Sequence, residues 1–326
     1  MLESLMGRFR GAKQGGLALG VQFDGERVAL AGLSAGPGAP RLLAAALVEE
    51  SQGEEAVQAR LRSAGLRRAP VTLCLAPGEY ELVNMERPPV PEEELVEAVR
   101  WKVGDLLPWP VEEAVIDVFV IPGLDRHARA ADWVFVVAAR RHLIEDRLQR
   151  AEALGLRPRF VDIPEFALRN LDARLGNPQQ SVAHLLVREQ DSLLCVTRGD
   201  VLFFSRDIMH GAQDLAVPTQ GELALANDAG EAIVLEVQRS LDYFDSHFGQ
   251  PPVARLLVSP PGERLDGLRN ALATGLGLAV EALDSQALAE DADARLLQAG
   301  LLDEPAMILA LGAAMRGLPV AAEEAA

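Results

Sequence analysis

Two turns that contain glycine are the segments best suited to bind a ligand, because such turns hold phosphate groups in nucleotide-binding folds. The first, Asp24-Gly25, lies between apolar runs within Leu17–Leu33, and the second, Arg198-Gly199-Asp200, lies within Val182–Ile208. Asp-Gly between alternating apolar residues predicts a β-hairpin, since both turn positions tolerate positive φ. The repeated hairpin indicates two related half-domains, whose turns are candidate phosphate sites.

Other residues with chemical potential give weaker patterns. Asp162 and Glu165 could form a carboxylate pair for acid–base work, but we interpret Asp162 as a strand-end residue and Glu165 as a first-turn helix charge. Ser259 lacks the glycines of a nucleophile elbow. The histidines show no metal-ligand spacing; they are His127, His142, His184, His210 and His247.

The two cysteines, Cys74 and Cys195, lie inside apolar, strand-like runs. We interpret both as buried thiols in a reducing compartment, since a disulfide or a metal site has little support from two such residues. The formal net charge of −17 over 326 residues argues against nucleic acid as a partner, because phosphate binding needs clustered Lys and Arg.

The sequence contains no apolar run near the length of about 18 residues that a membrane span needs. Glu3 and Gly7 interrupt any signal-peptide core, so we expect a cytoplasmic protein. An N-terminal apolar stripe with basic neighbours could be an amphipathic helix touching an anionic membrane, or a terminal turn without function. The stripe comprises Leu2, Leu5, Met6 and Phe9, and the basic residues are Arg8, Arg10 and Lys13.

Elements that would position these residues follow an α/β order. The stretch Leu42–Val48 predicts a third strand, although its alanines leave a helix possible, and Gly176-Asn177-Pro178 is the best domain boundary. Periodicity predicts further strands near 71–75, 115–121, 133–138, 159–163, 256–259 and 278–283, and helices near 54–64, 91–106, 140–154, 164–171, 231–247, 265–272 and 304–317.

Two tryptophans flank the end of the helix that Pro91 introduces. The apolar stripe of this helix is Leu95, Val99, Val103 and Leu106. We expect Trp101 to pack within this region, and Trp109, between two prolines, to be exposed and able to anchor a partner.

Several stretches in this order resemble the MshI family of MSHA pilus biogenesis proteins, which is similar to PilM and to the cytoplasmic part of GspL. The first are Glu79-Tyr80-Glu81-Leu82 and Ala98-Val99-Arg100-Trp101-Lys102-Val103. Further stretches resemble PilM; they are 110–117, 161–168, 204–208, 236–243 and 310–317.

This resemblance implies an actin-like (FtsA/PilM-like) two-lobed α/β fold with an inserted 1C-type subdomain. It divides the chain into subdomain 1A (1–79 and 157–176), the insert (80–156), subdomain 2 (2A/2B, 177–304), and a closing helix with a disordered tail (305–326). It also implies a place at the cytoplasmic face of the inner membrane, where PilM grips the cytoplasmic tail of PilN between the insert and its parent subdomain.

The nucleotide-binding segments of PilM are altered here. Where PilM reads Gly-Leu-Asp-Ile-Gly-Ser-Ser, this chain has Gln22 for the Mg²⁺-organising Asp, Asp24 for a Gly, and Ala29 in place of a following Lys. The family's Asp-Ile-Gly-Ala falls near Leu185–Arg188, where this chain has lost the pattern and Glu189-Gln190-Asp191 follow. Ser259-Pro260-Pro261-Gly262 stands where PilM has Ser-Gly-Gly-Gly. The resemblance therefore implies a vestigial pocket in which binding of ATP and Mg²⁺ is weak or absent, with no catalytic residues; the pocket comprises Gly20, Gln22, Asp24, Gly25 and Ser259.

We accordingly expect a non-catalytic scaffold of a type IV pilus or MSHA-type assembly platform. It would bind the tail of a PilN-like membrane protein, contact other platform proteins and perhaps the assembly ATPase, and reach the membrane through partners. The partner-binding candidates in the insert are Leu106, Leu107, Trp109 and Val111. The alternatives are an active ATPase and a GspL-like component of type II secretion, which the end of the chain at Ala326 disfavours.

Overall fold

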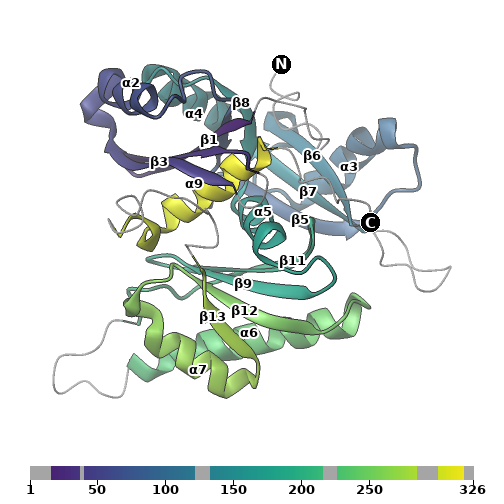
Figure 1. Ribbon diagram of the computed structural model, residues 1–326. Helices are drawn as coiled ribbons and strands as arrows, with labels where there is room; N and C mark the ends of the chain where they lie inside the picture. The colour runs from purple at the N-terminus through teal and green to yellow at the C-terminus, as the bar shows by residue number, and fades with distance from the viewer. Residues whose placement is uncertain (1–15, 37–39, 122–132, 216–225, 285–299, 319–326) are drawn as a thin grey trace, which may run out of the picture.

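The computed structural model describes residues 16–36, 40–121, 133–215, 226–284 and 300–318. Two five-stranded sheets lie one above the other, with two helices between them and a smaller sheet beside the upper one (Figure 1). The N-terminal segment, for which an amphipathic helix and a terminal turn are both open, and the tail after residue 318 lie outside the described residues.

The first sheet has the strand order β3-β2-β1-β4-β8. Its strands are β1 (Leu17–Asp24), β2 (Arg27–Ser34), β3 (Arg41–Glu49), β4 (Val71–Cys74) and β8 (Pro158–Asp162). β1, β2 and β3 pair antiparallel, whereas β4 and β8 join β1 in parallel. The predicted hairpin at Leu17–Leu33 is confirmed, with Gly25-Glu26 as its two turn residues, one position beyond the predicted pair.

The second sheet repeats this topology, in the order β11-β10-β9-β12-β13. Its strands are β9 (Ser181–Val187), β10 (Ser192–Arg198), β11 (Val201–Ile208), β12 (Val253–Ser259) and β13 (Ala279–Ala282). β9, β10 and β11 again pair antiparallel, and β12 and β13 follow in parallel. The prediction of two related half-domains is therefore confirmed by strand order and direction.

Helices α5 (Pro164–Leu175) and α9 (Pro305–Arg316) lie between the two sheets (Figure 1). They approach closely because two glycines leave room: a Cβ on Gly312 would stand 2.1 Å from the Ala167 carbonyl oxygen. A Cβ on Gly20 would likewise stand 1.8 Å from the carbonyl oxygen of Ala310, so β1 packs directly on α9. These contacts join the lobes through one continuous apolar core.

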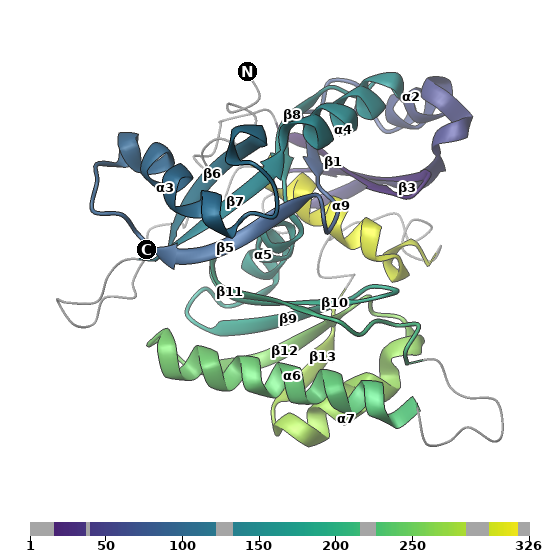
Figure 2. The ribbon, with the colours of Figure 1, turned by 180° about the vertical axis from the view of Figure 1, so that it is seen from behind.

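Further helices cover the outer faces of the sheets (Figure 2). In the first lobe, α2 (Gly53–Ser63) and α4 (Arg141–Ala153) bury Val57, Leu61 and Ala151 in a second core. In the second lobe, α6 (Ala226–His247) and α7 (Asp266–Leu276) bury their apolar stripes against the sheet. The predicted insert, residues 80–156, thus includes α4, whose buried face belongs to the first-lobe core.

The third sheet, with the order β5-β7-β6, stands beside the first lobe. It comprises β5 (Tyr80–Glu86), β6 (Ala114–Ile121) and β7 (Trp133–Arg140), all antiparallel. α3 (Leu95–Val103) packs on one face, and the other face meets α5, where the rings of Phe119 and Phe166 lie 4.5 Å apart. The sequence analysis did not predict β5, because acidic and amide residues interrupt its apolar pattern.

Most predicted elements agree with the structure to within a few residues, including the third strand, which is β3 rather than a helix. Cys74 and Cys195 are buried free thiols, as predicted. No helix within the described ranges is long and apolar enough to cross a membrane.

Candidate functional site

A cavity of about 710 Å³ lies between the two lobes and brings together three segments distant in sequence. They are the β1–β2 turn, the turn after β9, and the loop after β12. Gln22, Asp24 and Gly25 of the predicted vestigial pocket line this cleft. Three of the five residues predicted for the vestigial pocket therefore lie together in this cleft.

The other two predicted pocket residues have different roles. Gly20 does not line the cleft but lies beneath α9, where only a glycine fits. Ser259 is fully buried, and its hydroxyl lies 2.8 Å from Nε2 of His184. Both positions serve packing between elements.

The first turn is occupied by side chains of the protein itself. Arg150 donates a hydrogen bond of 2.7 Å to the Gly25 carbonyl oxygen and pairs with Glu50. Arg27 bridges Asp24 at 2.5 Å and Glu304 at 3.2 Å. A phosphate entering here would meet two carboxylates and an arginine that already has partners.

The β9–β10 turn, residues 188–191, is covered by the chain that follows β11. The amide groups of Ala212 and Gln213 donate to the carbonyl oxygens of Arg188 and Glu189, at 2.8 and 2.9 Å. A Cβ on Gly211 would lie 2.5 Å from the Asp191 amide nitrogen, so this segment lies directly against the turn. The turn therefore has a protein segment where a phosphate cradle would need open space.

The charge of the cleft is balanced within the protein. Five arginines line it, and each is within 4 Å of a carboxylate. Arg264, for example, makes a bidentate pair with Glu189 at 2.9 and 3.0 Å. An anionic ligand would have to displace carboxylates before any of these arginines became available. The five are Arg27, Arg147, Arg150, Arg188 and Arg264.

A buried polar network joins α5 to the second sheet. Asp172 accepts from Nδ1 of His184 at 2.7 Å and from the Thr197 hydroxyl at 2.9 Å, and Ser259 completes the chain. The order of groups is that of a hydrolase triad, but the side chains are buried, and none lines the interlobe cleft. The network satisfies polar groups at the junction of the lobes, and its signal in the sequence is His184 between the apolar residues of β9.

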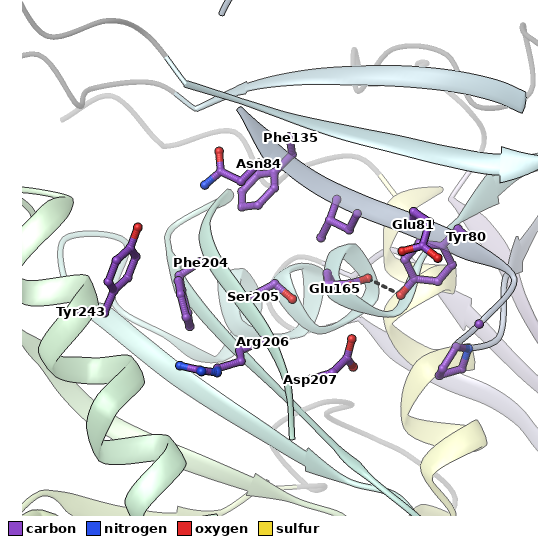
Figure 3. A pocket seen from close by; sticks show the side chains of 13 residues that line it. Tyr80, Glu81, Asn84, Phe135, Glu165, Phe204, Ser205, Arg206, Asp207 and Tyr243 are labelled. Carbon is purple, nitrogen blue, oxygen red and sulfur yellow. Dashed lines mark hydrogen bonds between the residues drawn. The ribbon is translucent and has the colours of Figure 1, made fainter. Parts of the chain in front are cut away.

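A second cavity, of about 580 Å³, lies between the third sheet and the second lobe (Figure 3). We call it the groove. β5 and β7 contribute one wall, β11 and α6 the other, and Glu165 of α5 the floor. Its aromatic end consists of Phe135, Phe204 and Tyr243, and its acidic end consists of Glu81, Glu165 and Asp207.

The acidic end contains a carboxyl group with a perturbed pKa. The hydroxyl of Tyr80 donates a hydrogen bond of 2.6 Å to Glu165, which is 3% exposed. Burial raises the pKa of Glu165 to about 7, although the Tyr80 hydrogen bond opposes this shift. Burial, followed by the Glu165 charge, also raises the pKa of Tyr80. Glu165 lies in the first turn of α5, as predicted, and its side chain is buried there.

Asp162 and Glu165 do not form a carboxylate pair for acid–base work. Asp162 accepts from the amide of Ile163 at 3.0 Å and lies 3.6 Å from Arg316, whereas Glu165 faces Tyr80. Within the described ranges, no three His, Cys, Asp or Glu side chains gather as a metal site. Tyr80 and Glu81 were not among the predicted site residues, although both belong to the stretch Glu79-Tyr80-Glu81-Leu82 that carries the family resemblance.

The predicted partner-binding residues lie around the α3–β6 connection. Leu107 is buried and Val111 packs beside it, whereas Leu106 is 57% exposed and departs from the predicted buried stripe. None of the four predicted residues lines the groove.

The predicted exposures of the two tryptophans are wrong, and the role of Trp109 as a partner anchor stays a prediction. Trp101 is 84% exposed because it lies on the side of α3 opposite Val99 and Val103, which face the sheet. Trp109 packs against the core under α3, and the guanidinium of Arg140 lies 4.5 Å from its ring centre.

Comparison with known proteins agrees with this architecture. A family model described as "Type IV pilus assembly protein PilM" matches residues 80–232. The structure titled "PilM-PilN type IV pilus biogenesis complex" is 25% identical, with a TM-score of 0.68, over 93% of this chain and 99% of that one. The chain is thus PilM-like and its fold is actin-like.

More distant structures share less. The cytoplasmic domain of EpsL, an inner-membrane component of the type II secretion system of Vibrio cholerae, is 16% identical with a TM-score of 0.44, over 79% of this chain and 95% of that one. A Bacteroides thetaiotaomicron protein with an actin-like ATPase fold is 10% identical with a TM-score of 0.46, over 86% of this chain and 98% of that one. No curated protein matches the sequence.

Proposed function

We propose that this protein is a non-catalytic scaffold of a type IV pilus assembly platform, of the MSHA type, that binds the cytoplasmic tail of a PilN-like inner-membrane protein. The observation that carries the proposal is the likeness to the PilM–PilN complex over nearly the whole of both chains. The scaffold would lie at the cytoplasmic face of the inner membrane and be held there by its partners. Other platform proteins, and the assembly ATPase, are further candidate partners.

The interlobe cleft supports a scaffold rather than an ATPase. The β1–β2 turn presents the Asp24 carboxylate and the Gly25 carbonyl oxygen, which already accepts a hydrogen bond from Arg150. The β9–β10 turn lies under residues 211–213. Catalysis of phosphoryl transfer rests on positioned cations and backbone donors, which here are engaged with the protein itself. The proposal therefore assigns partner binding to the surfaces around the third sheet.

The groove is the first surface to test for the tail. It offers an apolar wall, polar groups and a cavity of about 580 Å³, which are the ordinary features of a peptide site. The α3–β6 connection, with Leu106, Leu107, Trp109 and Val111, remains the competing surface, since the apolar side chain of Leu106 is 57% exposed there.

The experiment is a fluorescence anisotropy titration with labelled N-terminal tails of PilN-like proteins from MSHA and other type IV pilus systems. We expect saturable binding of at least one such tail, with no binding of the same residues in scrambled order. Failure of every tail to bind the folded protein would overturn the proposed function. Preference for tails from type II secretion systems would favour the EpsL-like alternative.

A second candidate function, ATP binding, is favoured by the cleft itself, whose volume and position between two lobes suit a nucleotide. Mg-ATP at 100 times its dissociation constant would add about 2.7 kcal/mol to the free energy of unfolding. We expect no change in melting temperature at millimolar Mg-ATP. A clear rise in melting temperature would support ATP binding in the cleft instead of the scaffold function without nucleotide.

A further inference from the structure

One end of the first sheet gathers arginines from separate segments. The strands β1, β4 and β8 are parallel and in step, with Leu19 beside Val71 and Val71 beside Pro158, so the loops that lead into β4 and β8 meet at one end of the sheet. β3 begins at the same end, since Arg41 pairs with Ser34 at the end of β2. We call this region the basic end; its exposed arginines are Arg41, Arg60, Arg62, Arg67, Arg68 and Arg157.

The helix α2 directs two of these arginines to the basic end. Its last turn contains Arg60 and Arg62, whereas its acidic residues are in its first turn. The loop after α2 returns directly onto the sheet, because a Cβ on Gly32 would stand 2.0 Å from the Leu66 side chain. Figure 1 shows α2 on the side of the first sheet that faces away from the second lobe. The basic end is therefore on the outside of the molecule.

The charge of the basic end is not neutralised within the protein. Among the described residues, none of its arginines is within 4 Å of a carboxylate, in contrast to the arginines of the interlobe cleft. The nearby acidic residue in sequence is Glu152, in the last turn of α4. The dipole of α2 accounts for Arg60 and Arg62, but Arg41 and Arg157 belong to other segments. Positive charge thus accumulates at one end of a chain whose formal net charge is −17.

The composition of the basic end favours a lipid surface over a protein partner. Its arginines extend across a sheet of five strands, about 20 Å at roughly 4.8 Å per strand. The exposed large hydrophobic side chains of the described residues all lie in the predicted insert or in the second lobe. A protein interface depends on such side chains as anchors, whereas arginines alone are attracted to anionic lipid headgroups.

We propose that the basic end binds directly to an anionic membrane surface, with its arginines against lipid phosphate groups. Arginine suits this role because its guanidinium can make two parallel hydrogen bonds to a phosphate. The β1–β2 turn is at the opposite end of the same strands, so the interlobe cleft faces away from the membrane. This inference goes beyond the proposed function, in which partners hold the protein at the membrane, and it involves no partner tail.

The first test is cosedimentation of the whole chain with vesicles, either phosphatidylcholine mixed with phosphatidylglycerol or phosphatidylcholine alone. We expect binding to the anionic vesicles only. This binding should weaken as the ionic strength rises from about 0.01 M to about 0.15 M, because the Debye length falls from about 30 Å to about 8 Å. Equal binding to both kinds of vesicle, or no binding to the anionic vesicles at the lower ionic strength, would overturn the proposal.

The second test uses two pairs of substitutions in separate segments of the basic end. Arg67→Gln/Arg68→Gln should weaken binding to the anionic vesicles by about 25-fold, since each arginine near an anionic surface contributes about fivefold. Arg41→Gln/Arg157→Gln should have a similar effect, because these arginines face the same surface. All four side chains are exposed, so we expect folded variants, which circular dichroism checks. Binding within about twofold of wild type in either folded variant would overturn the proposal.

The matched control, Arg198→Gln/Arg239→Gln, removes the same charge from the second lobe and should bind as the wild type does. An equal loss in this control would mean that net charge alone decides binding, and the proposal would fail. It would also fail if binding is lost only on replacing basic residues of the N-terminal segment by Gln; these are Arg8, Arg10 and Lys13.

An oligoglutamate peptide distinguishes a lipid from an acidic protein as the partner. We expect no saturable binding of this peptide at an ionic strength at which the anionic vesicles bind. Binding of the peptide that depends on Arg67 and Arg68, with none to vesicles, would assign the basic end to an acidic protein and overturn the proposal. Because no assay here contains a PilN-like tail, failure of this proposal leaves the proposed function untouched.

Discussion

The cleft and the groove are two cavities of one molecule that differ in whether their polar groups are paired within the protein. In the cleft, arginines and carboxylates satisfy one another, and chain segments lie across the turns. In the groove, a strand edge is open and a carboxylate lacks a partner within the described residues. Their common border is Pro77, which lines both cavities.

The difference shows that volume alone does not make a binding site. A ligand gains free energy only from groups that its arrival satisfies better than the protein and water did before. The cleft is the larger cavity but offers few such groups, whereas the smaller groove offers several. Four predictions test this comparison.

The largest effect is expected at Gly20, which the sequence placed in the nucleotide pocket and the structure places under α9. Gly20→Ala should lower the free energy of unfolding by about 3 kcal/mol or more, because its Cβ would collide with backbone atoms of α9. Urea unfolding measures the loss. Gly25→Ala is the matched control: it has space but a φ of 61°, so it should cost only about 1 kcal/mol. If Gly20→Ala unfolds with the same free energy as the wild type, Gly20 does not pack against α9 and its place in the predicted pocket would be restored.

The next prediction concerns Glu165 at the floor of the groove. Its pKa is about 7 in the folded protein against 4.5 for the free side chain, so above pH 4.5 the folded state binds more protons than the unfolded state. Its contribution to stability is therefore complete below pH 4.5 and is lost as the pH rises through 7. Glu165→Gln keeps an acceptor for Tyr80 and should stabilise the protein by about 3 kcal/mol at pH 8 but only about 1 kcal/mol at pH 5.

The measurement for Glu165 is the free energy of unfolding of wild type and variant at both pH values. Glu86→Gln serves as the exposed control on β5 and should show no such pH dependence. An advantage of Glu165→Gln that is the same at pH 5 and pH 8 would mean that Glu165 is not buried as a neutral acid, and the acidic end would need a different description.

A smaller effect separates the groove from the α3–β6 connection. Trp109→Ala should cost about 2 kcal/mol because its ring is packed under Arg140, whereas Trp101→Ala should change stability by less than about 0.5 kcal/mol. Thermal unfolding gives both values. If the groove is the tail site, both folded variants bind the tail within about twofold of wild type. Loss of tail binding in either one would move the site to this connection.

The smallest effect is expected for the cleft pair Arg264–Glu189. Both side chains are more than half exposed, so a double-mutant cycle with Arg264→Gln and Glu189→Gln should give a coupling free energy of about 0.2–1 kcal/mol. The coupling should fall further in 0.5 M salt, about where screening removes exposed interactions. A coupling free energy well above this range would mean that the Arg264–Glu189 pair is stronger than the exposure of its two side chains indicates.

Much of the fold followed from sequence periodicity. The Leu17–Leu33 hairpin and its repeat after Val182 predicted the duplicated sheets, because alternation and turn chemistry act over a few residues. The strand β5 was missed because its pattern is half polar, and a strand beside a groove needs no continuous apolar run. Gln22, Asp24 and Gly25 line the cleft, whereas Gly20 and Ser259 do not, since neighbours from α9 and β9 decide their surroundings.

The sequence by itself determined the α/β plan and the repeat of two related halves, because these depend on local patterns that survive in any context. Only the tertiary structure decided what the two cavities contain. Whether an arginine such as Arg264 meets Glu189 or solvent, and whether the edge of β11 is covered or open, depends on chain segments far apart in sequence. Those long-range pairings set the free energy that a ligand can gain, and no spacing of residue types encodes them.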